Sequence, residues 1–312
     1  PSLASQRIIS AKERGENADA LLDHHIAGES TLEKSEHIIT VDPPTTAFHL
    51  HPQTALFQDG VRIDSVYGCF PACDLNGGRA FLRERATPRQ MEEAFSLLAE
   101  HGVKARRTLT NMLADGDDLR DEYLSAMLAI AGRYDAEAIV YADLVGNYVR
   151  ERYGMRCVLS TTRALADAAE VNRMTKRYDY VVLDYNRHKD PAFLAALEDR
   201  DKVEVMVNEF CAYQCPHRAQ HYLHNSEDQR SGTMRPFECV AKRADFFDHE
   251  PGHPVIFTDR AVRDLHDAYG IGYFKIVGRG VAFQTVLEAY AYYLVRPEYR
   301  EDVKRMVMRA AG

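Results

Sequence analysis

Hydrophobic positions from about residue 62 onward alternate between two periods. Short aliphatic runs, typical of buried strands, are followed by segments in which apolar residues recur every three or four positions, as in amphipathic helices. The runs predict eight strands, at residues 63–67, 103–109, 138–143, 156–160, 178–184, 203–210, 255–257 and 273–276. Eight strands interleaved with helices are typical of an α/β fold of the (β/α)8 TIM-barrel type.

A doubly wound open sheet is the alternative fold, but no glycine-rich dinucleotide fingerprint follows any of these strands.

The first helix predicted in the barrel has a complete start signal. Thr87 is its N-cap, Pro88 is its first residue, and the Gln90 side chain can bond back to the backbone of the cap. The helix is predicted to end at Gly102. Further helices are expected at residues 119–132, 144–153, 163–176, 191–197, 259–269, 281–295 and 298–310.

The chain divides into three parts on this pattern. Residues 1–60 are predicted to be an N-terminal extension, residues 61–297 the barrel, and residues 298–312 a C-terminal helix. One connection breaks the rhythm, because about forty residues between Cys211 and His253 carry few strand or helix signals. Loops of that length tend to be functional or disordered. We therefore expect a long cysteine-bearing insertion after the sixth strand, at about 211–253.

Charge and hydropathy narrow the classes of partner. A net charge of -8 argues against a broad nucleic-acid surface, because such surfaces neutralise phosphates with Lys and Arg. No apolar run approaches the about 20 residues of a membrane span, and the N-terminus lacks a basic region followed by an apolar one. We expect a cytoplasmic protein. In a reducing compartment, clustered cysteines are more often metal-binding or catalytic than disulfide-bonded.

Four of the six cysteines form the leading candidate site. Barrel active sites are built from the loops that follow the strands, which would bring Cys73 to the same face as Cys211 and Cys215. Four converging thiolates suit zinc or an iron–sulfur cluster. The dispersed set of Cys73, Cys211, Cys215 and Cys239 favours a cluster, with Cys69 as the alternative to Cys73. A radical S-adenosylmethionine site is excluded, because Arg218 stands where its third cysteine would be.

Four stretches together resemble a known family: Asp64-Ser65-Val66-Tyr67-Gly68, Ser160-Thr161, residues 204–208, and Tyr273-Phe274-Lys275-Ile276-Val277-Gly278-Arg279. Their order is similar to that of the collagenase-like peptidase family, unassigned peptidase family thirty-two, over residues 60–297. The last stretch resembles the Lys-Ile-Glu-Gly-Arg signature of that family, with Val277 in place of Glu.

The resemblance implies a barrel-like core and, as in several members, a 4Fe-4S cluster held by Cys73, Cys211, Cys215 and Cys239. Those members support oxygen-independent hydroxylation of RNA bases or, in a paired complex, of a ubiquinone precursor. The chain departs from the usual His-Gly-x-x-Cys motif, since Asn208-Glu209-Phe210 precedes Cys211. The function expected is redox or hydroxylation chemistry on a small or carrier-bound substrate. Alternatives are a metal-stabilised binding or assembly subunit with a protein partner, or a zinc-dependent hydrolase.

Ionisable residues near the strand ends are the other candidates. Glu209 follows a strand, where burial would suit it to acid–base work. Lys275 and Arg279 would place two cations at the barrel mouth, suited to a carboxylate or phosphate. Salt bridges within the loops are the alternative roles for all three. Weaker candidates are His217 and His221, which would share a helix face, and Ser160, Asp184 and Asn186 at strand ends.

Overall fold

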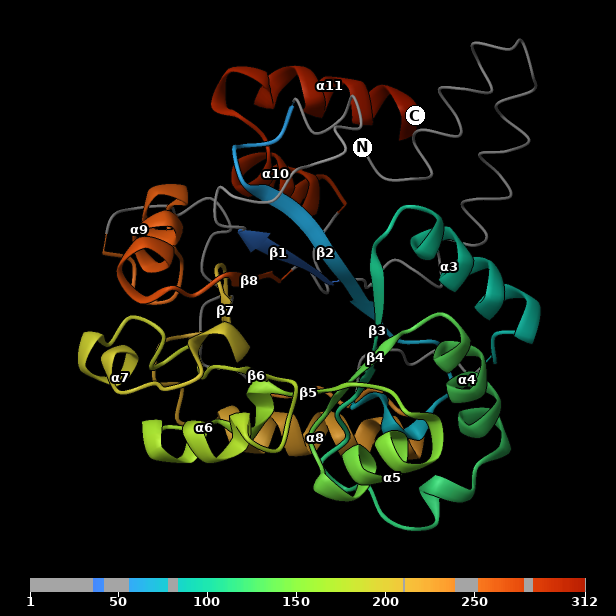
Figure 1. Ribbon diagram of the computed structural model, residues 1–312. Coiled ribbons are helices and arrows are strands. Elements are labelled where there is room, and N and C mark those ends of the chain that lie inside the picture. Colours follow the sequence, from blue (N-terminus) through green and yellow to red (C-terminus); the bar gives the residue numbers. More distant parts are fainter. Residues whose placement is uncertain are drawn as a thin grey trace, which may run out of the picture.

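The computed structural model (Figure 1) describes residues 36–41, 56–77, 84–209, 211–238, 252–277 and 283–311. Within these residues, eight strands close into a barrel in chain order. The strands are β1 (Glu36–Val41), β2 (Val61–Gly68), β3 (Lys104–Leu109), β4 (Glu137–Val140), β5 (Cys157–Leu159), β6 (Tyr180–Val182), β7 (Val203–Met206) and β8 (Tyr273–Ile276). The seven strands β2 to β8 run parallel to one another, whereas β1 is antiparallel to both of its neighbours.

Helices alternate with the parallel strands, as the hydrophobic pattern predicts (Figure 1). They are α3 (Pro88–Glu100), α4 (Glu122–Arg133), α5 (Asp143–Tyr153), α6 (Ala168–Thr175), α7 (Pro191–Ala195), α8 (Arg218–Ser231), α9 (Asp259–Tyr269), α10 (Phe283–Leu294) and α11 (Arg300–Ala311). The capping box at the start of α3 forms, with the Gln90 amide N–H donating to the Thr87 hydroxyl. No helix in the described ranges is long and apolar enough to cross a membrane.

The barrel differs from the predicted (β/α)8 pattern in one strand. Residues 255–257 form no strand, and Ile256 makes only an isolated bridge with Asn208. The eighth place is taken by β1, which belongs to the sequence expected to be an N-terminal extension. Its pairing with β2 and β8 covers two strand edges that would otherwise expose unpaired backbone groups. Residues 1–35 and 42–55 of the predicted extension lie outside the described residues.

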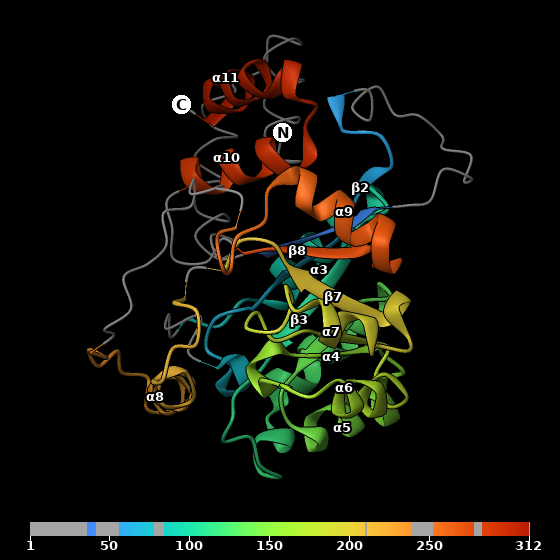
Figure 2. The same cartoon turned by 90° about the vertical axis from the view of Figure 1, so that its left-hand side faces the viewer.

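The insertion after β7 contains a helix that extends well beyond the helix face expected for His217 and His221. Helix α8 has fourteen residues, and nearly all of them are polar. Without an apolar stripe it lacks the signal by which amphipathic helices are recognised. Figure 2 shows α8 at the left of the view, away from α6 and α7. Residues 239–251 of the insertion lie outside the described ranges.

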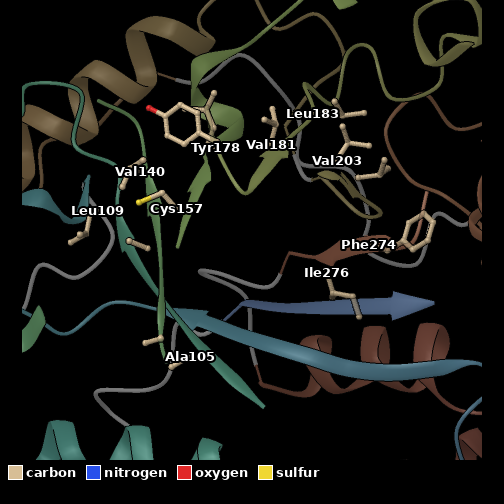
Figure 3. Packing of buried hydrophobic residues seen from close by; sticks show 14 of the residues in the cluster. Ala105, Leu109, Val140, Cys157, Tyr178, Val181, Leu183, Val203, Phe274 and Ile276 are labelled. Atoms are coloured by element: carbon tan, nitrogen blue, oxygen red, sulfur yellow. The ribbon is translucent and has the colours of Figure 1, made fainter. Parts of the chain in front are cut away.

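Two hydrophobic clusters lie on the two sides of the barrel wall. The outer cluster packs strand residues such as Val181 and Leu183 against the surrounding helices (Figure 3). The inner cluster contains the intervening Val182 together with Ile139 and Met206. Both faces of the parallel strands are therefore buried. This burial explains why the strands read as continuous apolar runs rather than alternating ones.

A network of charged side chains is buried inside the barrel. The Arg106 guanidinium, from β3, donates from Nε to Glu137 Oε2 at 2.5 Å and from Nη1 to Glu204 Oε1. Asp64 of β2 approaches Nη2 at 3.9 Å. The side chains of Arg106, Glu137 and Glu204 are at most 1% exposed. Charges this deeply buried persist only when they are paired, so the network ties β3 to β4 and, across the barrel, to β7.

Replacing Arg106 with Met should lower the free energy of unfolding by about 3–5 kcal/mol, because two carboxylates lose their buried partner. Urea denaturation measures this loss. Arg133→Met is the matched control, since Arg133 pairs with Glu92 on the surface and should change stability by less than about 1 kcal/mol. Equal effects of the two substitutions would contradict the role given to Arg106.

The segment that replaces the predicted seventh strand is held by two residues that follow β6. Lys189 Nζ donates to the Ile256 carbonyl at 2.6 Å and lies 4.4 Å from the ring centroid of Phe257. The fully buried His188 ring meets Phe257 edge-on, with 4.7 Å between centroids. Burial, and next the charge of Lys189, lowers the pKa of His188 to about 3. His188 is therefore neutral in the folded protein at neutral pH.

This histidine should make the protein less stable in mild acid. An unfolded histidine binds a proton below about pH 6.5, whereas folded His188 does so only near pH 3. The unfolded chain therefore binds more protons between these values, and stability falls as the pH drops through this window. His188→Gln should reduce the slope by up to about 1.4 kcal/mol per pH unit. Urea titrations at pH 4 to 7 test this, with exposed His101→Gln as the control.

Candidate active site

A pocket, which we call the mouth pocket, lies at the end of the barrel where the parallel strands finish, the mouth of the barrel. Its eleven lining residues come from β2, β3, β4, β7, β8, the segments after β3, β5, β7 and β8, and α8. Six of them carry hydroxyl groups: Tyr67, Thr108, Thr110, Ser160, Thr161 and Tyr222. Glu209 and Lys275 are the acidic and the basic side chain of the lining. The pocket therefore has the position of a barrel active site and a strongly polar lining.

Lys275 reaches this pocket from inside the barrel. On β8 its neighbours Phe274 and Ile276 belong to the outer cluster, so the alternation of the strand directs Lys275 inward. The side chain is buried, and Nζ lies 3.6 Å from the ring centroid of Tyr67. The negative face of that ring stabilises the ammonium group in a place with little water. The structure thus places Lys275, a predicted site residue, in the lining of this pocket.

Two buried hydroxyls of the pocket lack hydrogen-bond partners among the described residues: the phenol of Tyr67 and Oγ1 of Thr110. Buried polar atoms are nearly always satisfied, by protein, water or a ligand. Both atoms belong to residues that line the pocket. They are therefore groups that a polar ligand in the pocket would satisfy.

Glu209 lines the same pocket from the segment after β7. Its Oε1 accepts a hydrogen bond from the Cys211 amide at 3.0 Å, which orients the carboxylate. The preceding Asn208 exchanges side-chain hydrogen bonds with Val277, at 2.7 Å to its amide and 2.9 Å to its carbonyl. This amide pairing fixes the end of β7 beside the end of β8. Burial raises the pKa of nearby Tyr222. The positive charge of Arg218 opposes this shift, and the negative charge of Glu209 adds to it.

Arg218 fixes α8 at one side of the mouth. Its Nη1 donates to Asp184 Oδ1 at 2.5 Å and its Nη2 to the Thr161 carbonyl at 3.0 Å, while Nε donates to the Tyr222 hydroxyl at 3.1 Å. The guanidinium also lies 4.1 Å from the ring centroid of Tyr185. Arg218 was not predicted as a site residue, because a single arginine in a sequence does not reveal which groups it will contact.

The other side of the mouth receives the middle of α8. Asn111, just after β3, donates to the Ser226 carbonyl at 3.1 Å, and the Met112 amide donates to the Ser226 hydroxyl at 3.0 Å. Together with Arg218, these bonds place α8 across the strand ends. The helix is positioned by polar contacts rather than by an apolar face.

The weaker candidates have mainly local roles. Ser160 lines the pocket, but its hydroxyl also accepts a hydrogen bond from the Thr162 amide at 3.2 Å. Asn186 accepts one from the Gln214 amide at 2.8 Å. His217 contacts Gln220, and His221 stacks on Phe237 with 4.4 Å between centroids. Neither histidine lines the pocket.

The thiols fall into two separate pairs. Cys211 contacts Cys215 and packs against the inner cluster beside the pocket. Burial raises the pKa of Cys211 to about 11. A hydrogen bond with Tyr185 opposes this shift, and the negative charge of Glu209 adds to it. Cys73, with Cys69 nearby, belongs instead to the outer cluster. Burial there raises the pKa of Cys73 to about 12, although the charge of Arg107 opposes the shift.

These positions do not fit a cluster held by Cys73 together with Cys211 and Cys215. In the described part of the chain, no three His, Cys, Asp or Glu side chains gather closely enough to hold a metal ion. Cys239, the other predicted ligand, and Arg279 lie outside the described residues. The 4Fe-4S cluster, and zinc as its alternative, stay predictions. We derive no chemical step through either.

Iron and sulfide analysis after anaerobic purification tests the cluster. If it forms, Cys211→Ser should remove the bound iron and a broad absorption near ~400 nm, whereas Cys157→Ser should leave both, because that thiol is buried in the outer cluster. Stoichiometric zinc in a colourless protein would contradict the prediction. Loss of iron in Cys73→Ser would show that Cys73 is a ligand, and full retention would agree with its place outside the barrel wall.

Comparison with known proteins gives one similar solved structure, that of the U32 peptidase Mk0906. It has a TM-score of 0.47 and 13% sequence identity to this chain, and the match covers 68% of this chain and 84% of that one. No family model matches the sequence, and the curated proteins contain no match either. A structural neighbour of this chain is thus a U32 peptidase at low sequence identity.

Proposed function

We propose that the chain is an enzyme that binds a small polar substrate with an anionic group in the mouth pocket and transfers a proton there. The observation that carries the proposal is a buried lysine and a glutamate lining one pocket together with six hydroxyl-bearing residues. Such a lining is polar where most small-molecule sites are largely apolar. The substrate would be held mainly by hydrogen bonds and charge.

Lys275 is the residue that would bind the anionic group. A buried ammonium costs several kcal/mol of lost hydration, and the Tyr67 ring offsets part of that cost. A carboxylate or phosphate of the substrate would add a charge-assisted hydrogen bond in surroundings with little water. The unpartnered hydroxyls of Tyr67 and Thr110 supply further polar contacts in the same pocket.

Glu209 is the residue that would move the proton. Its carboxylate is held by the Cys211 amide and lies on a segment fixed by Asn208, so its position is defined before substrate binds. A general base must reach the proton that it removes, and defined geometry contributes to its efficiency. The nearby Tyr222 phenol keeps its proton, because burial raises its pKa, and it can donate a hydrogen bond to a ligand in this pocket.

One observation favours redox chemistry as a second candidate. Cys211 and Cys215 contact each other beside the pocket that contains Glu209. Paired thiols are ligands for iron–sulfur clusters and zinc, which keeps cluster-dependent hydroxylation and zinc-dependent hydrolysis among the proposals. A binding or assembly subunit with a protein partner is the non-enzymatic alternative.

Replacing Lys275 with Met should weaken the binding of small carboxylates by tenfold or more, because hydrogen bonds to charged groups contribute about 1.5–3 kcal/mol. Titrations of acetate, succinate and citrate, followed by ligand-observed NMR, measure the affinities. Lys304→Met is the matched control, since Lys304 of α11 pairs with Glu288 of α10 and lines no part of the pocket.

Glu209→Gln separates binding from proton transfer in the same titrations. Removing its negative charge should leave carboxylate binding unchanged or make it tighter, because repulsion between like charges is lost. The proposal fails if none of the three compounds binds saturably to the wild-type protein. It fails equally if Lys275→Met and Lys304→Met bind them alike.

A further inference from the structure

A second hollow lies at the opposite end of the barrel, where strands begin. It has a volume of about 470 Å³, which is within the range of small-molecule sites. Its lining includes Arg156 just before β5, Tyr180 at the start of β6, Lys202 just before β7 and Tyr273 at the start of β8. We call it the basal groove. Its place at the amino ends of four neighbouring strands separates it from the mouth pocket.

Positive charge is concentrated in the basal groove. Five cations line it, against two carboxylates, in a chain whose net charge is -8. The cations are Arg150, Arg156, Lys176, Arg177 and Lys202, and the carboxylates are Asp179 and Asp201. A concave surface with one predominant sign of charge concentrates ligands of the opposite sign. The groove is therefore suited to an anion.

Two of these cations have neutral partners. Arg150 donates to the Asn147 side-chain oxygen at 3.4 Å, and Lys202 donates to the Thr175 carbonyl at 3.1 Å. The other three pair with carboxylates: Arg156 with Glu137, Lys176 with Asp199, and Arg177 with Asp143. A hydrogen bond to a neutral oxygen compensates less of the charge than a direct ion pair does, although the Asp199 carboxylate interacts with the charge of Lys202. Arg150 and Lys202 are therefore the residues best placed to bind phosphate oxygens.

Aromatic rings form another part of the lining. The rings of Tyr180 and Tyr273 lie 4.8 Å apart and their hydroxyls are 3.2 Å apart, so each holds the other in place. Tyr178 is the third ring, and the Arg150 guanidinium lies 5.5 Å from its centroid. Rigid aromatic side chains next to cations suit a ligand with both a planar ring and an anionic group.

We propose that the basal groove binds a phosphorylated small molecule of the nucleoside monophosphate class, with its phosphate on Arg150 and Lys202 and its ring against the tyrosines. The size of the groove accommodates one such molecule. The acidic net charge of the chain opposes the long phosphate contacts that a nucleic-acid strand would need. This inference does not depend on the function proposed for the mouth pocket.

Calorimetric titration of the full chain with adenosine 5′-monophosphate tests the proposal. We expect saturable binding that weakens about tenfold or more in Arg150→Ala and in Lys202→Ala, since each removes a charge-assisted hydrogen bond. Arg173→Ala is the matched control, because Arg173 is an exposed cation of α6 that does not line the groove. Its affinity should equal that of the wild type. Circular dichroism establishes that each variant is folded.

Companion titrations identify what the groove recognises. Adenosine should bind much more weakly than the monophosphate, and inorganic phosphate should bind with an affinity below that of the nucleotide. Lys275→Met should bind the nucleotide as the wild type does, which separates this site from the mouth pocket. The proposal is overturned if the nucleotide does not bind, or if Arg173→Ala weakens its binding as much as Arg150→Ala and Lys202→Ala do. It is also overturned if a single-stranded oligonucleotide binds more tightly than the nucleotide and its affinity is unchanged in Arg150→Ala and Lys202→Ala.

Discussion

The buried guanidinium of Arg106 is the contact on which the barrel depends. Its carboxylate partners come from β4 and from β7 across the interior, so one cation links strands that are far apart in the sequence. An apolar interior would fill the same space without fixing which strands face each other. Buried charges are costly when they lack their ion pairs, and these pairs form only when the strands take their native places. The ion pairs contribute to the uniqueness of the barrel as well as to its stability.

The interior changes in character from one end of the barrel to the other. Near the strand starts it contains the Arg106 network and the tyrosine pair of Tyr180 and Tyr273. Above these lie apolar side chains such as Ile139 and Val182, and then the hydroxyls, Lys275 and Glu209 at the mouth. The apolar layer separates the Arg106 network from Lys275 and Glu209. Electrostatic interactions are strong in this interior because its dielectric constant is low. The ligands proposed for the two ends of the barrel would therefore occupy separate regions.

Much of the fold could be predicted from the sequence, because strands buried on both faces appear as continuous apolar runs. Residues 255–257 have the same composition, yet Val255 and Ile256 pack into the inner cluster outside any strand. A run of three apolar residues is too short to distinguish a buried strand from a buried segment outside any strand. Strand β1 was not predicted, since its pairing with β8 depends on a partner near the other end of the chain. Only the start of helix α8 was predicted, from the spacing of His217 and His221, because polar contacts position the rest of it.

The candidate site could be predicted where the strand itself sets the side-chain direction. Lys275 lies on β8 and Glu209 follows β7 closely, and both line the pocket at the mouth. Cys73 comes five residues after the end of β2, beyond the control of that strand. The preceding Ala72 has a φ of 56°, in the left-handed region, and this turns the chain before the thiol. Such a turn cannot be read from spacing alone.

The antiparallel strand β1 also bears on the order in which the protein forms. It lies next to β2 in the sequence but also pairs with β8, which is more than 230 residues further along the chain. Contacts between distant parts of a chain form late, because the intervening loop must first be ordered. Closing the barrel therefore requires a contact between segments far apart in the sequence, and such contacts are expected to slow folding.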